Sequence, residues 1–294
     1  MSFINEIQDK ADRAATVLNA KGVENRYCSF SSKPGQATGR VWAPSQAMTK
    51  FQMEQALGDW AEDTVRNAIN KCEGFKAIPF GDNDKTLSED QNFADLYRAG
   101  KQREIEFGKR SDLLLFDANA KTPEDASVLS GKQAEELGKT CLASLEVRSS
   151  RTSAQRYTEY QLQQKADGKR PSRTEPSFTV KIEDLEKVFR WIARNEKPVL
   201  YIQVFFDQIH ALNFSFVFDF IIDAGSKLKL EKPARSAKPT IMIPISYGNS
   251  IGSVTPPDFT VVHNQHANGR HDIYAMPFGG SAVIDIRQLI RTLE

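Results

Sequence analysis

Two short apolar segments, "SDLLLFDA" and "CLASLEVRSS", constrain the fold of this chain most. Both are too short for a typical helix and are rich in Leu, Val and Phe, which predicts two buried β-strands. In the second segment Glu146 and Arg148 are two residues apart. Alternate side chains of a strand point to opposite faces, so we expect both to lie on the face opposite Leu145 and Val147. An acidic and a basic side chain would then share one surface.

The remaining elements alternate between helices and strands. Helical spacing of apolar residues or helix-end signals predict helices at residues 4–18, at residues 51–69 after a cap at Ser45, at residues 132–138, at residues 181–197 and from Ile284 onward. Apolar, aromatic-rich runs predict strands at residues 198–209 and 213–223. This order predicts a mixed α/β fold with a central mixed β-sheet flanked by helices.

Composition is that of an ordinary globular protein. The 294 residues are 40% hydrophobic and 26% charged, and no linker clearly divides them. We therefore expect one domain over residues 1–294. No apolar run is long enough for a membrane span and the start of the chain does not resemble a signal peptide, so we expect a cytoplasmic protein. Three widely separated cysteines argue against a disulfide framework or a cysteine zinc site.

The charge of the chain is concentrated locally. The net charge of +1 does not by itself indicate a nucleic-acid-binding protein. Residues 148–173, however, hold seven basic and two acidic residues. This segment fits a solvated loop and a phosphate-contacting surface equally well. In the second reading Arg151 and Arg156 contact DNA.

The two predicted strands also carry the residue types of a metal site. Asp112 begins the first strand and Glu146 lies in the second, and adjacent strands are about 4.8 Å apart. Mg²⁺ prefers one or two carboxylates together with water and phosphate oxygens. Such an ion can activate water for phosphodiester hydrolysis, and Arg148 could neutralise charge on the phosphate.

"RSDLLLFD" followed by "LEVRSS" resembles the bipartite signature of the PD-(D/E)xK nuclease superfamily, and the resemblance covers roughly residues 58–219. The segment "GDWAEDTVRNAIN" is similar to the helix that often supplies a third acid, here Glu62. "SFTVKIEDL" and "YIQVFFDQIHALNF" resemble segments of type II restriction endonucleases of the AccI type. The resemblance implies a restriction-endonuclease-like core at about residues 46–223, with residues 224–294 contributing to DNA recognition.

The function implied is Mg²⁺-dependent, sequence-specific cleavage of double-stranded DNA by a homodimer, with Asp112, Glu146 and Glu62 as metal ligands. One position departs from the family pattern. Arg148 stands where members carry a lysine, and arginine cannot act as a base at neutral pH. Either Arg148 acts only electrostatically, or a lysine from elsewhere takes the place; Lys181 is the candidate.

A polar segment near the C-terminus offers base-reading side chains. Asn264, Gln265, Asn268 and Arg270 are the types that bind adenine and guanine edges. His263, His266 and His271 in the same segment could suggest zinc, but without further ligands they favour a polar loop.

Three other functions are also compatible with the sequence. One is a repair or recombination nuclease of the same fold that recognises DNA structure, and another is an inactive DNA-binding protein. The segment "GNSIG" around Ser250 also matches a serine-hydrolase elbow, although the prolines that follow argue against the required helix. No phosphate-binding motif of the P-loop or dinucleotide type occurs, so no nucleotide cofactor is expected.

Overall fold

The computed structural model describes residues 3–35, 49–81, 93–129, 131–171, 173–231, 239–265 and 271–294. The helices are α1 (Phe3–Ala20), α2 (Thr49–Ile69), α3 (Phe93–Phe107), α4 (Gly131–Thr140), α5 (Ala154–Ala166), α6 (Ile182–Asn195), α7 (Ser215–Ala224) and α8 (Ile286–Arg291). The strands are β1 (Phe75–Pro79), β2 (Leu113–Asp117), β3 (Ala143–Ser149), β4 (Ser177–Lys181), β5 (Val199–Val204), β6 (Gln208–Asn213), β7 (Thr240–Pro244), β8 (Asn249–Thr255), β9 (Asp258–Gln265), β10 (His271–Phe278) and β11 (Ser281–Ile284).

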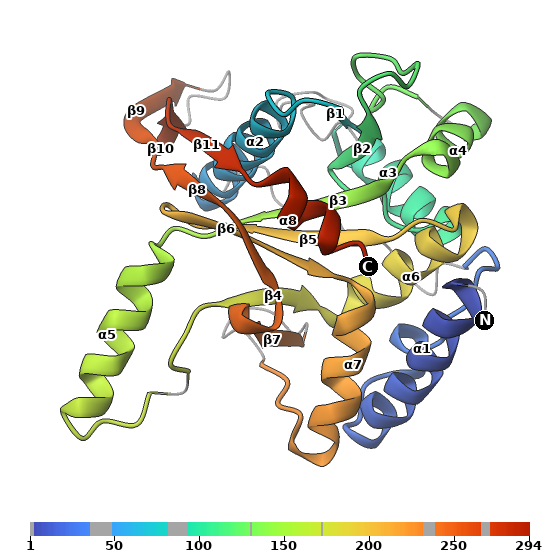
Figure 1. Cartoon of the computed structure of the whole chain (residues 1–294), viewed down its shortest axis with the longest axis horizontal. Coiled ribbons are helices and arrows are strands. Elements are labelled where there is room, and N and C mark those ends of the chain that lie inside the picture. The colour runs from blue at the N-terminus through green and yellow to red at the C-terminus, as the bar shows by residue number, and fades with distance from the viewer. Residues whose placement is uncertain are drawn as a thin grey trace.

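Seven strands form one sheet in the order β1-β2-β3-β5-β6-β8-β11, with helices packed around it (Figure 1). The pair β3–β5 is parallel and its neighbours β2–β3 and β5–β6 are antiparallel. A parallel pair needs a long crossover connection, and here the connection contains α5, β4 and α6. The expected mixed α/β fold, consistent with a restriction-endonuclease-like core, is confirmed. Two smaller two-stranded sheets, β9–β10 and β4–β7, complete the structure.

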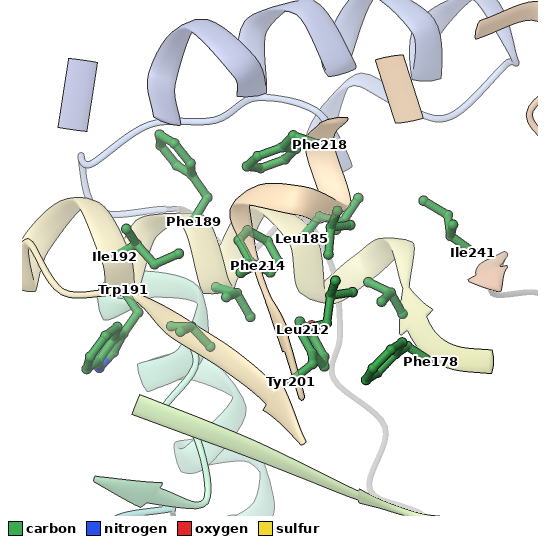
Figure 2. Packing of buried hydrophobic residues seen from close by; sticks show 14 of the residues in the cluster. Phe178, Leu185, Phe189, Trp191, Ile192, Tyr201, Leu212, Phe214, Phe218 and Ile241 are labelled. Atoms are coloured by element: carbon green, nitrogen blue, oxygen red, sulfur yellow. The ribbon is translucent and has the colours of Figure 1, made fainter. Parts of the chain in front are cut away.

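Each face of the large sheet is covered by its own apolar cluster. Helix α2 packs on the face that carries Leu145 and Val147. On the opposite face, α1, α6 and α7 enclose an aromatic-rich core that includes Tyr201 (Figure 2). In this core Phe214 and Phe218 are in edge-to-face contact, with ring centroids 5.1 Å apart. The two clusters hold the middle strands rigidly, and β3 therefore presents its polar residues from a fixed backbone.

One predicted strand is wrong. Residues 213–223, expected as a strand, form the end of β6 and then α7. The segment is rich in phenylalanine, which favours a strand. Its buried apolar residues, however, are Phe214, Val217, Phe218 and Ile221, which follow helical spacing, while Phe216 is exposed. The predicted strand at residues 198–209 is also interrupted by a turn between β5 and β6.

Some elements were not expected from the sequence. The basic segment after β3 contains α5, α3 precedes β2, and β9 and β10 pair as a two-stranded ribbon. Ser45, the expected helix cap, lies outside the described residues. Among the described residues, no helix is long and apolar enough to cross a membrane.

Candidate active site

Asp112 and Glu146 face each other across two neighbouring strands. The antiparallel register pairs Leu113 with Leu145, and one further step places Asp112 opposite Glu146. Directly paired residues of an antiparallel sheet have Cβ atoms about 5 Å apart. Glu146 and Arg148 lie on the same side of β3, as the alternation predicted, and Leu145 and Val147 lie on the other side. The strand pair therefore brings the two predicted carboxylates together.

Asp112 is held by the backbone of the partner strand. Its Oδ2 accepts a hydrogen bond of 2.6 Å from the backbone N–H of Val147. Burial and the neighbouring Glu146 carboxylate raise the pKa of Asp112 to about 7, because both disfavour its charged form. Lys109 and Arg148 act in the opposite direction and are outweighed. The raised pKa of Asp112 shows that the cations around it do not fully offset its burial beside a second carboxylate.

Glu146 is almost completely buried, with 1% of its side chain exposed, and it carries two cationic partners. Arg148 Nη2 lies 2.7 Å from Glu146 Oε1. The Lys109 ammonium group contacts the same oxygen. The other oxygen, Oε2, is buried and has no hydrogen-bond partner among the described residues. A buried carboxylate oxygen without a donor is costly unless a ligand satisfies it.

A second buried acid, Asp184, ties both cations together. Its Oδ2 lies 3.2 Å from Arg148 Nη2 and 3.4 Å from Lys109 Nζ. Burial alone would raise the pKa of Asp184, but Lys109 and Arg148 outweigh it and lower the pKa well below its ordinary value. In return, Asp184 and Glu146 overcome the effect of burial and raise the pKa of both Lys109 and Arg148. Both cations therefore remain charged and neither is a base at neutral pH.

A glycine brings Lys109 to this cluster. Gly108 has φ +93°, a conformation that residues with a Cβ rarely adopt. A Cβ at this position would lie 2.5 Å from the backbone nitrogen of Trp191 in α6. Because Gly108 has none, the chain can approach α6 closely, and Lys109 N–H donates to the carbonyl of Lys187 over 3.1 Å. The Lys109 side chain then starts beside the first turns of α6, close to Asp184.

The structure does not bring two of the predicted site residues into this cluster. Lys181 precedes α6 and is exposed, and within the described residues it makes no ion pair. Although the residue as a whole is exposed, partial burial of its ammonium group and the nearby charges of Arg148 and Lys109 outweigh the effect of Asp184 and lower its pKa. Glu62 is half-buried on α2, which packs on the face of the sheet opposite to Glu146. No three His, Cys, Asp or Glu side chains in the described parts of the chain are grouped to hold a metal ion.

Lys109 and Asp184 were not identified from the sequence. Lys109 is three residues before Asp112 in "GKRSD", and its preceding glycine was the available signal. Asp184 lies in the first turn of α6, where an acid is accounted for by the helix dipole alone. Only its buried position distinguishes it from Glu183, which is half-buried and lies one residue earlier.

The predicted DNA-contacting residues are distributed over two surfaces. Arg151 and Arg156 line a groove of about 690 Å³ beside the root of α5. Gln265 is exposed at the end of β9. Asn264 also belongs to β9, and Asn268 and Arg270 lie outside the described residues.

Within the described residues, neither of the two alternative motifs forms the site it suggested. Ser250 lies within β8, whereas a nucleophile elbow requires a turn between a strand and a helix. His263 and His271 stack on each other across β9–β10, with Nε2 and Nδ1 3.0 Å apart. His266, the third histidine of the motif, lies outside the described residues.

Comparison with protein families gives a match over most of the chain. No curated protein and no solved structure matched the chain. The profile of the AccI restriction endonuclease family matches two segments, residues 21–171 and 169–294, which include both strands of the candidate site. With nearly its whole length matched, the chain belongs to the AccI restriction endonuclease family and is a type II, site-specific deoxyribonuclease.

Proposed function

We propose that the chain hydrolyses phosphodiester bonds of double-stranded DNA at the Asp112–Glu146 pair with Mg²⁺. The observation that carries this proposal is the buried Glu146 Oε2, which has no hydrogen-bond partner in the described structure and lies on the strand opposite Asp112. Two carboxylates are the usual protein contribution to a Mg²⁺ site, so these residues fit the ion. When bound, the ion lowers the pKa of an attacking water and polarises the phosphate.

In this proposal the cations of the site stabilise charge. Arg148 is partly exposed, so its guanidinium can bind a phosphate while it still contacts Glu146. Lys109 is proposed as the lysine of the site in place of Lys181, because its ammonium group contacts Glu146. Fixed positive charges aimed at the phosphate favour the transition state, in which negative charge accumulates. The proton of the attacking water would pass to solvent or phosphate, since Lys109 and Arg148 stay protonated.

We further infer a cytoplasmic homodimer of one-domain subunits. One Asp112–Glu146 pair cuts one strand, so cleavage of both strands at a symmetric sequence requires two subunits related by a two-fold axis. The β9–β10 ribbon, with Gln265 at the end of β9, remains a proposed base-reading surface, because a two-stranded ribbon fits the major groove.

Digestion of a long, sequenced DNA duplex tests the proposal. We expect discrete fragments with Mg²⁺, none with EDTA, and none from Asp112→Ala or Glu146→Ala. Asp117→Ala is the matched control, because Asp117 is an exposed acid at the other end of β2. Mn²⁺ binding, followed by electron paramagnetic resonance, should weaken in the two site variants and not in the control.

Three results would contradict the proposal. Cleavage that persists in Asp112→Ala and Glu146→Ala would exclude this site. Smeared products that follow branched or nicked DNA would indicate recognition of DNA structure. DNA binding without cleavage in Mg²⁺ or Mn²⁺ would mean that Lys109 and Arg148 permanently occupy Glu146 in an inactive protein.

A further inference from the structure

Helix α5 is an arm with almost no support from the rest of the chain. It projects away from the body of the protein, beyond the end of the sheet (Figure 1). Of its 13 residues only Ala154, the first, is buried. Tyr160 and Leu162 have 59% and 52% of their surface exposed. A 13-residue helix is about 20 Å long, so most of the arm lies clear of the core.

The root of the arm is fixed to the sheet by Asp207, in the turn between β5 and β6. Asp207 accepts hydrogen bonds from the Ser153 hydroxyl over 2.6 Å, from Ala154 N–H over 2.7 Å and from Gln155 N–H over 3.0 Å. These bonds satisfy N–H groups that a helix start leaves unpaired. The arm therefore extends in a defined direction from the end of the sheet.

The position of the arm relates it to the candidate active site. Ser153 is five residues after Arg148, so the helix begins within about 18 Å of Arg148 in space. The β9–β10 ribbon projects at the same end of the sheet (Figure 1). Residues Val254 and Pro256, which lead to that ribbon, line one groove together with Arg156 and Tyr160 of α5.

The four glutamines of α5 divide into two pairs. Gln155 donates to Glu159 over 2.9 Å, and Gln163 donates to Asp167 over 2.8 Å. These four residues follow one another at intervals of four and form one stripe of the helix, which contains both acids of the segment. We call it the bonded stripe.

Gln161 and Gln164 lie on the opposite side of the helix, near Tyr157. Residues 157, 161 and 164 share a face because they are separated by four and three positions. The side-chain amides of Gln161 and Gln164 make no hydrogen bond within the described residues, although both residues are half-buried. No acid occurs among the residues of this face. Arg156 and Tyr160 border it on the side of the bonded stripe. We call these two residues together with Tyr157, Gln161 and Gln164 the open face.

We propose that the open face of α5 reads duplex DNA. In this arrangement α5 lies in the major groove, Gln161 and Gln164 contact base edges, and Arg156 contacts the DNA backbone. This inference rests on the proposed function and adds a specificity element to it. Charge favours DNA as the occupant, because residues 154–173 hold five basic and two acidic residues and both acids are engaged on the bonded stripe. The major groove is about 12 Å wide and admits one α-helix.

The residue types define what the arm recognises. A glutamine amide offers an NH₂ group that donates and a carbonyl oxygen that accepts, which match N7 and the amino group of adenine. Unbonded Gln161 and Gln164 can present both groups, whereas the NH₂ groups of Gln155 and Gln163 are each held by a hydrogen bond to an acid of the bonded stripe. The cleavage site is therefore expected to contain an A·T pair that is read by α5.

The experiment compares two double variants of the full-length protein. The cleavage site is first mapped with wild-type protein, Mg²⁺ and long DNA. Cleavage rates are then measured on duplexes with one base pair of the site changed at a time. Gln161→Ala/Gln164→Ala should lower discrimination at an A·T position by about 5- to 150-fold, the range expected for one bidentate contact. Gln155→Ala/Gln163→Ala is the matched control and should keep the wild-type pattern.

Equal discrimination by both double variants at every position would overturn the inference. So would a change in sedimentation behaviour of Gln161→Ala/Gln164→Ala without a change in discrimination, because α5 would then contact a second copy of the chain. Failure of the wild-type protein to cleave any DNA would instead contradict the proposed function. In that case selection of bound duplexes from a random pool, with the same variants, measures readout by α5 without cleavage.

Discussion

The ammonium group of Lys109 contacts the carboxylate of Glu146, although 37 positions separate the two residues in sequence. This contact joins the segment before β2 to the middle of β3. It brings a lysine to Glu146, which Arg148, two positions later in the strand, also contacts. The lysine that the family pattern carries in the strand is thus available from a different part of the chain.

Replacement of Lys109 by Met should reduce cleavage much more than replacement of Lys181 by Met. Lys109 contacts Glu146, and removal of one fixed charge that stabilises a transition state commonly costs about 10²- to 10³-fold in rate. Lys181 is exposed and unpaired within the described structure, so a change of only a few-fold is expected. Single-turnover cleavage rates measure both variants, and DNA affinity in Ca²⁺ separates binding from chemistry. A larger loss in Lys181→Met would restore Lys181 as the active lysine.

Replacement of Asp112 by Asn should change how stability depends on pH. The pKa of Asp112 is raised to about 7, so protonation of this group stabilises the folded state below about pH 4, and that stabilisation is lost as the pH rises through 7. Without metal, wild-type protein should lose up to about 4 kcal/mol between pH 4 and pH 8 relative to Asp112→Asn.

Urea unfolding of both proteins at pH 4 and pH 8 measures this difference, with Asp117→Asn as the control for a surface acid. Mg²⁺ at pH 8 should stabilise the wild-type protein and not Asp112→Asn, because the ion favours the charged carboxylate. A constant difference between the two proteins at all pH values would show that Asp112 titrates normally.

Replacement of Gly108 by Ala should destabilise the protein strongly. The new Cβ would lie 2.5 Å from Trp191 N and 2.7 Å from the Lys187 carbonyl, and φ is positive. Gly168→Ala is matched for conformation, since φ is +77° and nothing lies within 4 Å of the added Cβ. We expect about 1 kcal/mol for the control and at least about 3 kcal/mol for Gly108→Ala, measured as free energies of urea unfolding. Equal losses would mean that contact with α6 is not tight.

Replacement of Asp207 by Ala should release the root of α5. Three hydrogen bonds to Ser153 and the first turn are lost, and loss of a side chain that caps a helix start costs about 0.5–2 kcal/mol. Burial favours a higher pKa for Asp207, but the bonds from Ser153, Gln155 and Ala154 outweigh it and lower the pKa. The cap is therefore intact at neutral pH and is lost only as the pH falls below about 4, through the lowered pKa. Limited proteolysis should cut Asp207→Ala within residues 154–171 faster than wild-type protein, whereas Asp219→Ala should behave as wild type.

The sequence by itself determined the strand pair and its chemistry. Alternation in a strand places Glu146 and Arg148 on one face whatever the rest of the fold, and apolar content buries Leu113 and Leu145. The aromatic-rich run at residues 213–223 predicted a strand wrongly, because the choice between helix and strand there depended on which phenylalanines the core could bury.

Only the tertiary structure decided which distant groups meet Glu146. Lys109 and Asp184 arrive there because Gly108 allows close contact with α6, and no periodicity in the sequence encodes that contact. Glu62, in contrast, is kept away from Glu146, because the apolar stripe of its helix packs on the other face of the sheet. Local patterns fix which side of an element is apolar, but long-range packing sets the few ångströms that decide whether two charges interact.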